Sequence, residues 1–296
     1  MKSGMVSIVG RPNVGKSTLL NKILGKKIAI TSDKSGTTRN IILGVYNDDE
    51  SQIVFVDTPG IHKPEHKLDK VLNDKSYLMT NPVDLILFMV DISKGFGKGD
   101  RFVLERIKES NNKIILLLNK IDRLNKEDLI KRINEISKEY DFVEIIPLSS
   151  IKGINLNELI KTIKKHLPNS EKYYDDDYVT NQPMSLIITE RVREKVLHLT
   201  HDEIPHTVTC VLDTLDEDEN LISAGVTIIV DRDNLKKILI GKQGLMLKEI
   251  GTRARIDLEE FFKKKVFLSL YVKTIKNWRD RESLIHELDL KDDLDE

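Results

Sequence analysis

The sequence predicts an α/β domain with a doubly wound, mostly parallel sheet, followed by a smaller α+β domain. Short apolar runs alternate with helical patterns through the first 167 residues, as in a series of β-α-β units. A polar stretch flanked by prolines interrupts this pattern at 168–183, and a different order of elements follows. The length of 296 residues also favours two domains, because one domain takes roughly 150 residues.

The strands of the first domain are predicted from short runs that are apolar on both faces. Such runs are typical of parallel strands that helices cover on both sides. They span residues 5–9, 52–57, 84–91, 113–119 and 142–149. Helical patterns lie between and after them, at 17–25, 100–110, 126–140 and 155–167.

The change of pattern sets the expected domain limits. The second domain shows the order helix, strand, strand, helix, helix, strand. A long surface loop inside one domain is the alternative to a linker, but the new order of elements favours the linker. We expect a first domain over 1–170, a linker over 171–183, a second domain over 184–280 and an acidic, fraying tail over 281–296.

The composition favours a soluble cytoplasmic protein. Apolar residues make up 40% of the chain, which is enough for ordinary cores, and the net charge is −1. Cys210 is the single cysteine, so no intramolecular disulfide can form, as suits a reducing compartment. We see no signal core and no apolar run near the ~20 residues of a membrane span. Contact with a membrane surface stays open.

A phosphate-binding loop is predicted at GRPNVGKST, residues 10–18, between the first strand and the first helix. The pattern and its context match the P-loop. Gly10 and Gly15 let backbone N–H groups surround phosphate oxygens, and the helix N-terminus adds its positive end. Lys16 is expected to reach the β- and γ-phosphates, and the Ser17 hydroxyl to bind Mg²⁺.

The segment DTPG, residues 57–60, ends the second apolar run. Asp57 can hold the Mg²⁺ shell, and the Gly60 N–H can sense the γ-phosphate. This segment would then meet both the metal ion and the γ-phosphate.

The segment NKID, residues 119–122, points to guanine. A buried Asp122 can accept hydrogen bonds from guanine N1–H and its 2-amino group, whereas adenine would leave the carboxylate unpaired. Asn119 can bond the N7 edge or tie loops together, and Lys120 can cover the base. A helix cap is the alternative for NKID alone, but the upstream motifs favour GTP.

The order P-loop, threonine loop, DTPG and NKID resembles Ras-like GTPases of the translation-factor class. By this resemblance SGTTRN, residues 35–40, is the first switch, and Thr38 ligates Mg²⁺, with Thr37 as the next candidate. SSI, residues 149–151, resembles the loop whose backbone N–H reads the guanine oxygen. The expected nucleotide-binding residues are Gly10, Arg11, Pro12, Asn13, Val14, Gly15, Lys16, Ser17, Thr18, Asp57, Thr58, Pro59, Gly60, Ile61, Asn119, Lys120, Ile121, Asp122, Ser149, Ser150 and Ile151. The expected catalytic residues are Lys16, Ser17, Thr38, Asp57, Gly60 and Asn13, of which Ser17, Thr38 and Asp57 are the expected Mg²⁺ ligands.

The chain lacks the glutamine that orients water in Ras-type enzymes, because Ile61 stands at that place. In some relatives a P-loop asparagine helps to hold K⁺, and Asn13 stands at that position. We hypothesise the same role here; the alternative is that Asn13 only shapes the loop. His62 could be a general base, but a mobile switch residue is the favoured interpretation.

The second domain carries GKQG, residues 241–244, between two amphipathic helices. Glycines at this place would let a sugar-phosphate backbone approach, and the next helix N-terminus favours phosphate. Residues 231–280 hold 13 Lys and Arg against 7 Asp and Glu, a net of +6, while 200–220 hold 7 acidic residues and no basic one. Such segregation is typical of a nucleic-acid surface.

The element order with its Gly-x-x-Gly is that of a type II KH domain, which clamps about four nucleotides of single-stranded RNA. A fold used only for protein contacts is the alternative. The apolar Ile238, Ile240 and Leu247 could floor the base groove, but core packing is favoured for each. The cluster KKK at 263–265 could contact RNA or anionic lipid. Alternatively, these lysines are only solvated charges at the start of a strand. The expected RNA-binding residues are Ile240, Gly241, Lys242, Gln243, Gly244, Lys237, Lys248, Arg253 and Arg255.

One GTPase domain followed by one type II KH domain resembles the Era family over nearly the whole chain, through GRPNVGKST, TTRN, DTPGIHKP, NKID and IGKQG. Gly36 departs from many relatives, which have glutamine there. The resemblance implies a cytoplasmic GTPase that acts in assembly of the small ribosomal subunit and binds 16S ribosomal RNA near its 3′ end. It also implies peripheral association with the inner face of the membrane.

The expected mechanism is an RNA-coupled switch with slow intrinsic turnover. Segments 33–40 and 57–80 would order around the γ-phosphate and relax after hydrolysis. We expect GTP or GDP and Mg²⁺ as ligands, with K⁺ as a candidate, a monomer, and no DNA partner. A passive RNA adaptor with structural GTP and a membrane-associated GTPase are the alternatives.

Overall fold

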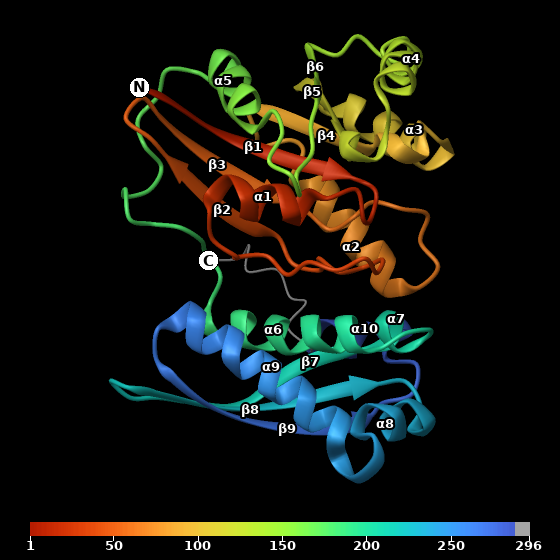
Figure 1. Cartoon of the computed structure of the whole chain (residues 1–296), viewed down its shortest axis with the longest axis vertical. Helices are drawn as coiled ribbons and strands as arrows, with labels where there is room; N and C mark the ends of the chain where they lie inside the picture. Colours follow the sequence, from red (N-terminus) through yellow and green to blue (C-terminus); the bar gives the residue numbers. More distant parts are fainter. Residues whose placement is uncertain (288–296) are drawn as a thin grey trace. The chain divides into compact units, whose positions relative to one another are not determined.

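Six strands form the sheet of the first unit in the computed structural model, which describes residues 1–287 (Figure 1). Their order is β2-β3-β1-β4-β5-β6, and every pairing is parallel except that of β2 with β3. The strands are β1 (Lys2–Gly10), β2 (Ile42–Asn47), β3 (Ser51–Asp57), β4 (Leu85–Asp91), β5 (Lys113–Asn119) and β6 (Glu144–Pro147). The predicted doubly wound sheet is confirmed, and β2 is an antiparallel edge strand that the periodicity did not reveal.

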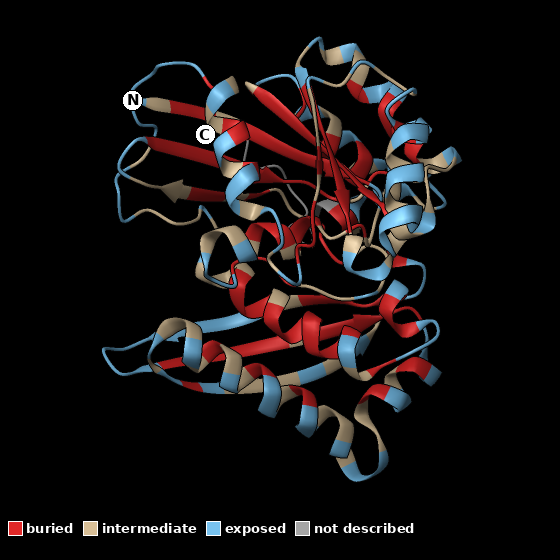
Figure 2. Cartoon of the chain, turned by 45° about the horizontal axis from the view of Figure 1, so that its top comes forward, coloured by how far each residue is buried: buried red, intermediate tan, exposed pale blue. Residues whose placement is uncertain are grey.

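Helices cover both faces of this sheet. Neighbouring residues of one strand belong to different cores: Ile8 packs with α1 and α5, and Val9 packs with α3 and α4. The central strands are accordingly buried along most of their length (Figure 2). The helices of the unit are α1 (Lys16–Leu24), α2 (Lys67–Leu78), α3 (Lys98–Ile107), α4 (Lys126–Ile136) and α5 (Leu156–His166).

The expected linker over 171–183 is corrected for its first part, because the first unit continues to Asn181. The fully buried side chain of Gln52 on β3 accepts hydrogen bonds from the backbone N–H groups of Tyr173 and Tyr174, at 2.7 and 3.0 Å. The Val45 N–H on β2 donates to the Val179 carbonyl at 3.0 Å. These backbone contacts hold the segment on the sheet.

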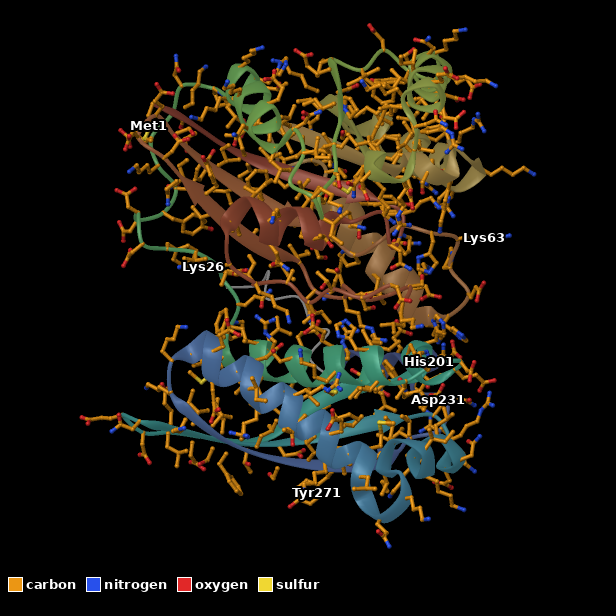
Figure 3. The ribbon with its side chains drawn as sticks, viewed as in Figure 1. Met1, Lys26, Lys63, His201, Asp231 and Tyr271 are labelled. Atoms are coloured by element: carbon orange, nitrogen blue, oxygen red, sulfur yellow. The ribbon has the colours of Figure 1, made fainter. Side chains whose placement is uncertain are left out.

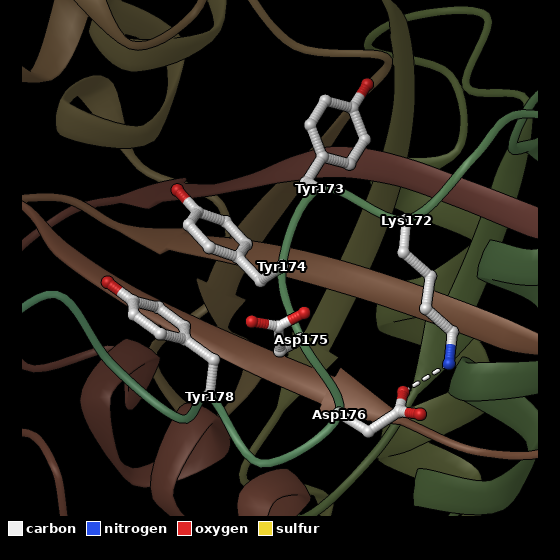
Figure 4. Close-up of a pocket in the computed structure, with 6 residues that line it drawn as sticks. All are labelled: Lys172, Tyr173, Tyr174, Asp175, Asp176 and Tyr178. Atoms are coloured by element: carbon white, nitrogen blue, oxygen red, sulfur yellow. Dashed lines mark hydrogen bonds and ion pairs between the residues drawn. The ribbon is translucent and has the colours of Figure 1, made fainter.

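The docked segment forms a shallow pocket of about 360 Å³ (Figure 4). The rings of Tyr174 and Tyr178 stack nearly parallel, with their centroids 4.4 Å apart. Lys172 forms an ion pair with Asp176, four residues further on. The pocket is lined by Lys172, Tyr173, Tyr174, Asp175, Asp176 and Tyr178.

The main part of the second unit begins at Gln182 and has a three-stranded sheet in the order β7-β8-β9. β7 and β8 are antiparallel, and β8 and β9 are parallel, which is the pairing of the predicted type II KH order. None of the helices in the described part of the chain has the length and apolar content that a membrane crossing needs. The elements are α6 (Met184–Leu199), α7 (Ile204–Thr207), β7 (Thr209–Glu217), β8 (Leu221–Val230), α8 (Asp233–Ile240), α9 (Leu245–Phe262), β9 (Lys265–Thr274) and α10 (Glu282–Glu287).

The acidic tail expected over 281–296 is helical at its start, in α10. Residues 288–296 lie outside the described part of the chain, so the fraying expected there stays a prediction.

Gln52→Ala should lower the free energy of unfolding by about 1–3 kcal/mol, because it leaves backbone N–H groups of the docked segment without an acceptor. Urea denaturation would measure the loss, and limited proteolysis should cut 171–181 sooner. The control is Lys172→Ala, which removes one exposed ion pair and should change stability little. Equal stability and equal proteolysis of the two variants would contradict the docking role of Gln52.

Candidate functional site

The P-loop joins the end of β1 to the start of α1, and its glycines are required by close contacts. A Cβ built on Gly10 would lie 2.4 Å from the carbonyl oxygen of Met89, and one on Gly15 would lie 2.3 Å from Asn119 Nδ2. Gly15 also has φ 112, a conformation that favours glycine. The loop is therefore packed tightly against the ends of β4 and β5.

Lys16 is buried beneath this loop. Its Nζ donates hydrogen bonds to the carbonyl oxygens of Gly10 and Arg11, at 3.1 and 3.2 Å. Burial lowers the pKa of Lys16 to about 8, although the charge of Asp57 acts in the opposite direction. Burial likewise raises the pKa of Asp57 to about 6 against the opposing effect of Lys16. A phosphate at Lys16 and a cation at Asp57 would each supply a countercharge.

The three expected Mg²⁺ ligands lie together. Ser17 Oγ donates to Asp57 Oδ2 at 2.6 Å and lies 2.8 Å from Thr38 Oγ1. Asp57 Oδ1 is buried and has no hydrogen-bond partner among residues 1–287. Carboxylate and hydroxyl oxygens are the donors that a hard divalent cation prefers. This set fits Mg²⁺, and the role of each residue in binding it stays a prediction.

The segment after β3 passes over the P-loop at Gly60. A Cβ at Gly60 would lie 2.6 Å from the backbone nitrogen of Pro12, so the two loops touch through main-chain atoms. The Ile61 N–H donates to the Gly10 carbonyl at 3.2 Å. The Ile61 side chain is fully buried in the core, so it cannot orient a water molecule.

His62 is held by several neighbours. Its backbone N–H donates to Asn73 Oδ1, and its carbonyl accepts from Asn73 Nδ2. Nδ1 lies 3.1 Å from the Gly60 carbonyl oxygen, and Nε2 lies 3.6 Å from Asp69. The hydrogen bond with Asp69 raises the pKa of His62. These contacts count against a free general base, and the favoured role as a switch residue stays a prediction.

Gly36 sits in the first expected switch with φ 72 and open space around its α-carbon. This conformation favours glycine over the glutamine of many relatives. The glycine is therefore suited to the local backbone of this chain.

Asn119 joins the phosphate loop to the last loop of the site. Its Nδ2 donates to the Val14 carbonyl at 2.7 Å, and its Oδ1 accepts from the N–H and the hydroxyl of Ser150. Of the two roles that the sequence left open, tying loops together is the one that the contacts support. A bond to the N7 edge of a purine stays a prediction.

Lys120 and Asp122 extend toward the same edge of the sheet. Lys120 Nζ donates to the Asn13 carbonyl at 2.6 Å and to Asp91 Oδ2 at 2.8 Å. Asp122 accepts a hydrogen bond from the Ser149 hydroxyl. Asp122 is exposed in the protein alone, so the burial that the guanine argument needs would have to come from a bound base, and its role in reading the base stays a prediction.

The remaining predicted residues surround these groups. The Thr58 hydroxyl donates to the Ile8 carbonyl, and the Pro59 carbonyl accepts from Ser76. The Ile121 N–H donates to the Leu148 carbonyl at 3.3 Å. Ile151 is 71% exposed. Thr18 lies in the first turn of α1.

Two acidic residues of the site were missed from the sequence. Asp91 ends β4 directly opposite Asn119 of β5 and forms the ion pair with Lys120. Asp100 of α3 is buried and pairs with Arg11 at 3.3 Å. The signal for Asp91 was its place at the carboxyl end of an apolar run, as for Asp57. Asp100 carries no comparable signal, because only folding brings α3 to the P-loop.

In the second unit, the GKQG loop has the backbone that its glycines predicted. Gly241 has φ 72, and a Cβ there would lie 2.9 Å from the backbone nitrogen of Met246. Gly244 has φ 77 and precedes α9, and Gln243 also has a positive φ of 53. The side chains of Lys242 and Gln243 are exposed. A phosphate can therefore approach main-chain atoms here.

The basic side chains around this loop differ in whether they form ion pairs. Lys237 and Lys248 are exposed, whereas Arg253 pairs with Glu249 and Arg255 pairs with Glu259 on the same helix. The two arginines are thus less available to RNA than the sequence suggested. Ile240 and Leu247 are half-buried beside the loop.

Ile238 does not pack in the core as favoured from the sequence. Its side chain is 52% exposed, because it lies on the outer side of α8 while Leu235 and Leu239 face the sheet. An exposed apolar residue beside a Gly-x-x-Gly loop is suited to contact with a base.

Comparison with known proteins finds one family that covers both units of the chain. A protein-family model described as a 50S ribosome-binding GTPase matches residues 5–120, and a KH-domain model matches residues 203–279. The chain is 41% identical to Era from Aquifex aeolicus bound to GDP·AlF4⁻, over 98% of this chain and 99% of that one, with a TM-score of 0.94. The chain belongs to the Era family.

A second Era structure, a complex with MgGDPNP and nucleotides 1506–1542 of 16S ribosomal RNA, is also 41% identical over 98% of this chain and 99% of that chain, with a TM-score of 0.95. The resemblance to the Era family that the motifs predicted is confirmed. The fold class, a P-loop GTPase domain followed by a KH domain, is confirmed with it.

Asp122→Asn should change the preferred nucleotide from GTP to xanthosine triphosphate. The amide presents a donor where the carboxylate accepts from the guanine 2-amino group, and xanthine has a carbonyl at that position. GTP affinity should fall by at least about a hundredfold, as expected when a base-reading hydrogen bond is lost. Competition against a fluorescent GDP analogue would measure both affinities.

Asp141→Asn is the control for this substitution, because Asp141 is also an exposed aspartate of the same unit but lies away from the loop. Unchanged GTP affinity in Asp122→Asn would show that this carboxylate does not read the base.

Proposed function

We propose that this Era-family GTPase couples GTP hydrolysis to binding of the small-subunit ribosomal RNA near its 3′ end, and that it acts in assembly of the small ribosomal subunit. The single observation that carries the proposal is the presence of both sites in one chain. The first unit has a P-loop together with the loops that we expect to read guanine, and the second unit has a Gly-x-x-Gly loop with exposed lysines.

The RNA assignment rests on the second unit. The description of the matching GTPase model mentions the 50S particle, but that model covers only residues 5–120. The solved Era complex holds 16S RNA and is similar to this chain over both units. We therefore assign the small-subunit RNA as the ligand of the KH domain.

In the proposed reaction, the P-loop binds the phosphates through its backbone and Lys16. Ser17, Thr38 and Asp57 would hold Mg²⁺, which supplies positive charge to the phosphates when it is bound. Gly60 would detect the γ-phosphate through its N–H. Because Ile61 is buried, no side chain at that place orients the attacking water, and intrinsic turnover is expected to be slow.

The RNA and the GTPase switches are expected to influence each other. We propose that the segments 33–40 and 57–80 order around the γ-phosphate and that their order changes the affinity for RNA. The protein would act in the cytoplasm as a monomer. Binding to anionic vesicles in competition with RNA would favour the alternative of a membrane-associated GTPase that uses the cluster at 263–265.

GTP turnover should rise when RNA copying the 3′ end of 16S RNA is added, relative to a scrambled RNA. The double substitution Lys242→Asp, Gln243→Asp should abolish this rise and leave basal turnover intact, because it repels phosphate from the loop. The control is Lys131→Asp, an exposed lysine of α4. Equal turnover with both RNAs would show that RNA binding is not coupled to GTP hydrolysis, and it would favour a passive adaptor.

Potassium should support faster turnover than sodium, by about tenfold, if Asn13 helps to hold the ion; this corresponds to about 1.4 kcal/mol of barrier. Asn13 has φ 64, at the turn of the P-loop. Asn13→Ala should remove the difference between the two ions. Asn111→Ala is the matched control, because Asn111 also has a positive φ, of 54. The same rate in both salts would leave Asn13 with a role in loop shape alone.

A further inference from the structure

The outer face of β9 presents two large aromatic side chains. Phe267 and Tyr271 are each 63% exposed and lie four residues apart, so they share one face of the strand. The opposite face packs on α9, where a Cβ on Gly251 would lie 3.3 Å from Leu270 Cδ1. Tyr271 points away from the helix-covered side of the sheet (Figure 3). Within residues 182–287, no helix of this unit therefore covers the face that carries the two rings.

Their neighbours on β8 leave the rings open. Ser223 pairs with Phe267, and Thr227 pairs with Tyr271, with Gly225 between them. These side chains are too small to cover an aromatic face. Within residues 1–287, no aromatic ring or cationic group stacks on either residue. Exposed flat rings beside small residues form a platform on which another planar group can stack.

The charges on this face indicate the kind of partner. Lys265 and Lys273 are exposed on the same face of β9, one beyond each aromatic residue. The far strand β7 instead carries exposed acidic residues, of which Asp213 accepts a hydrogen bond from Thr227 at 2.7 Å. Positive charge and aromatic rings are thus confined to β9, and negative charge lies on the other edge. This arrangement is complementary to a single polyanionic strand that runs along β9.

Helix α8 links the GKQG loop to the strand that carries the platform. This helix leads into the loop and packs against both β8 and β9, and β9 is the edge strand of the sheet. A chain held at the loop can therefore continue across the edge of β9 onto its outer face.

We propose that the outer face of β9 binds single-stranded RNA beyond the part held at the GKQG loop, with one base stacked on Phe267 and another on Tyr271 and the phosphates near Lys265 and Lys273. Aromatic side chains with adjacent cations are the usual platform for single strands. The inference rests on the proposed RNA-binding function and adds a second segment of RNA to it.

The spacing of the rings defines the bound form. Four residues of a strand span ~13 Å, much more than the ~3.4 Å between stacked bases. Each ring therefore takes its own base from an extended strand. Stacking of this kind tolerates any base, so this face adds affinity without selecting a sequence.

The test compares two RNAs with the full chain by fluorescence anisotropy. One RNA of about five nucleotides fills only the GKQG groove, and one of about twelve also reaches β9. Phe267→Ala and Tyr271→Ala should each lower the affinity for the longer RNA about fivefold or more. Neither should change the affinity for the shorter RNA. Tyr271→Trp should keep the affinity, and its fluorescence should change when the longer RNA binds.

Leu215→Ala is the matched control, because Leu215 is an exposed apolar residue of β7 in the same sheet. If the alanine variants bind the longer RNA as the wild type does, the inference is overturned and the proposed RNA site at the loop stands. If the wild type binds neither RNA, the inference and the proposed RNA site at the loop are both wrong. If the variants keep RNA affinity but bind the small subunit less well, the face contacts a protein and the inference is overturned.

Discussion

The side-chain amide of Asn119 is the interaction on which the GTP site depends. It donates to the P-loop at Val14 and accepts from the last loop at Ser150, so one planar group fixes the distance between the phosphate and base regions. The amide also lies where a side chain on Gly15 would clash. Gly15 follows β1 and Asn119 ends β5, four strands later in the sequence, and the two residues constrain each other. This contact explains why both motifs are needed before either one specifies a site.

Most of this arrangement could be predicted because the residues involved end predicted strands. Asp57 and Asn119 each follow an apolar run, and parallel strands bring their carboxyl ends to one edge of the sheet. The second unit was predictable for a similar reason, since its order of elements defines the sheet and GKQG marks the helix junction. Local sequence is sufficient where a site is built from the ends of regular elements.

The features that escaped prediction depend on contacts between distant parts of the chain. Strand β2 has the short apolar run IILGVY at 41–46, but only its pairing with β3 shows that it is an antiparallel edge strand. The burial of Gln52 and the exposure of Asp122 run against what their surroundings in the sequence suggest. Ile238 follows the periodicity of α8 but falls outside its buried stripe. In each case the surrounding fold determines the direction of the strand or the exposure of the side chain, and the local sequence pattern does not predict it.

The docking of residues 173–181 on β2 also protects an edge. β2 is the outermost strand of its sheet, and the contacts of Val45 with Val179 and of Leu43 with Asn181 occupy backbone groups that would otherwise face solvent. An open edge of this kind is a template for pairing with other chains. A GTPase fragment that ends at residue 170 would expose it and tend to self-associate, so the natural end of an isolated domain lies after Asn181.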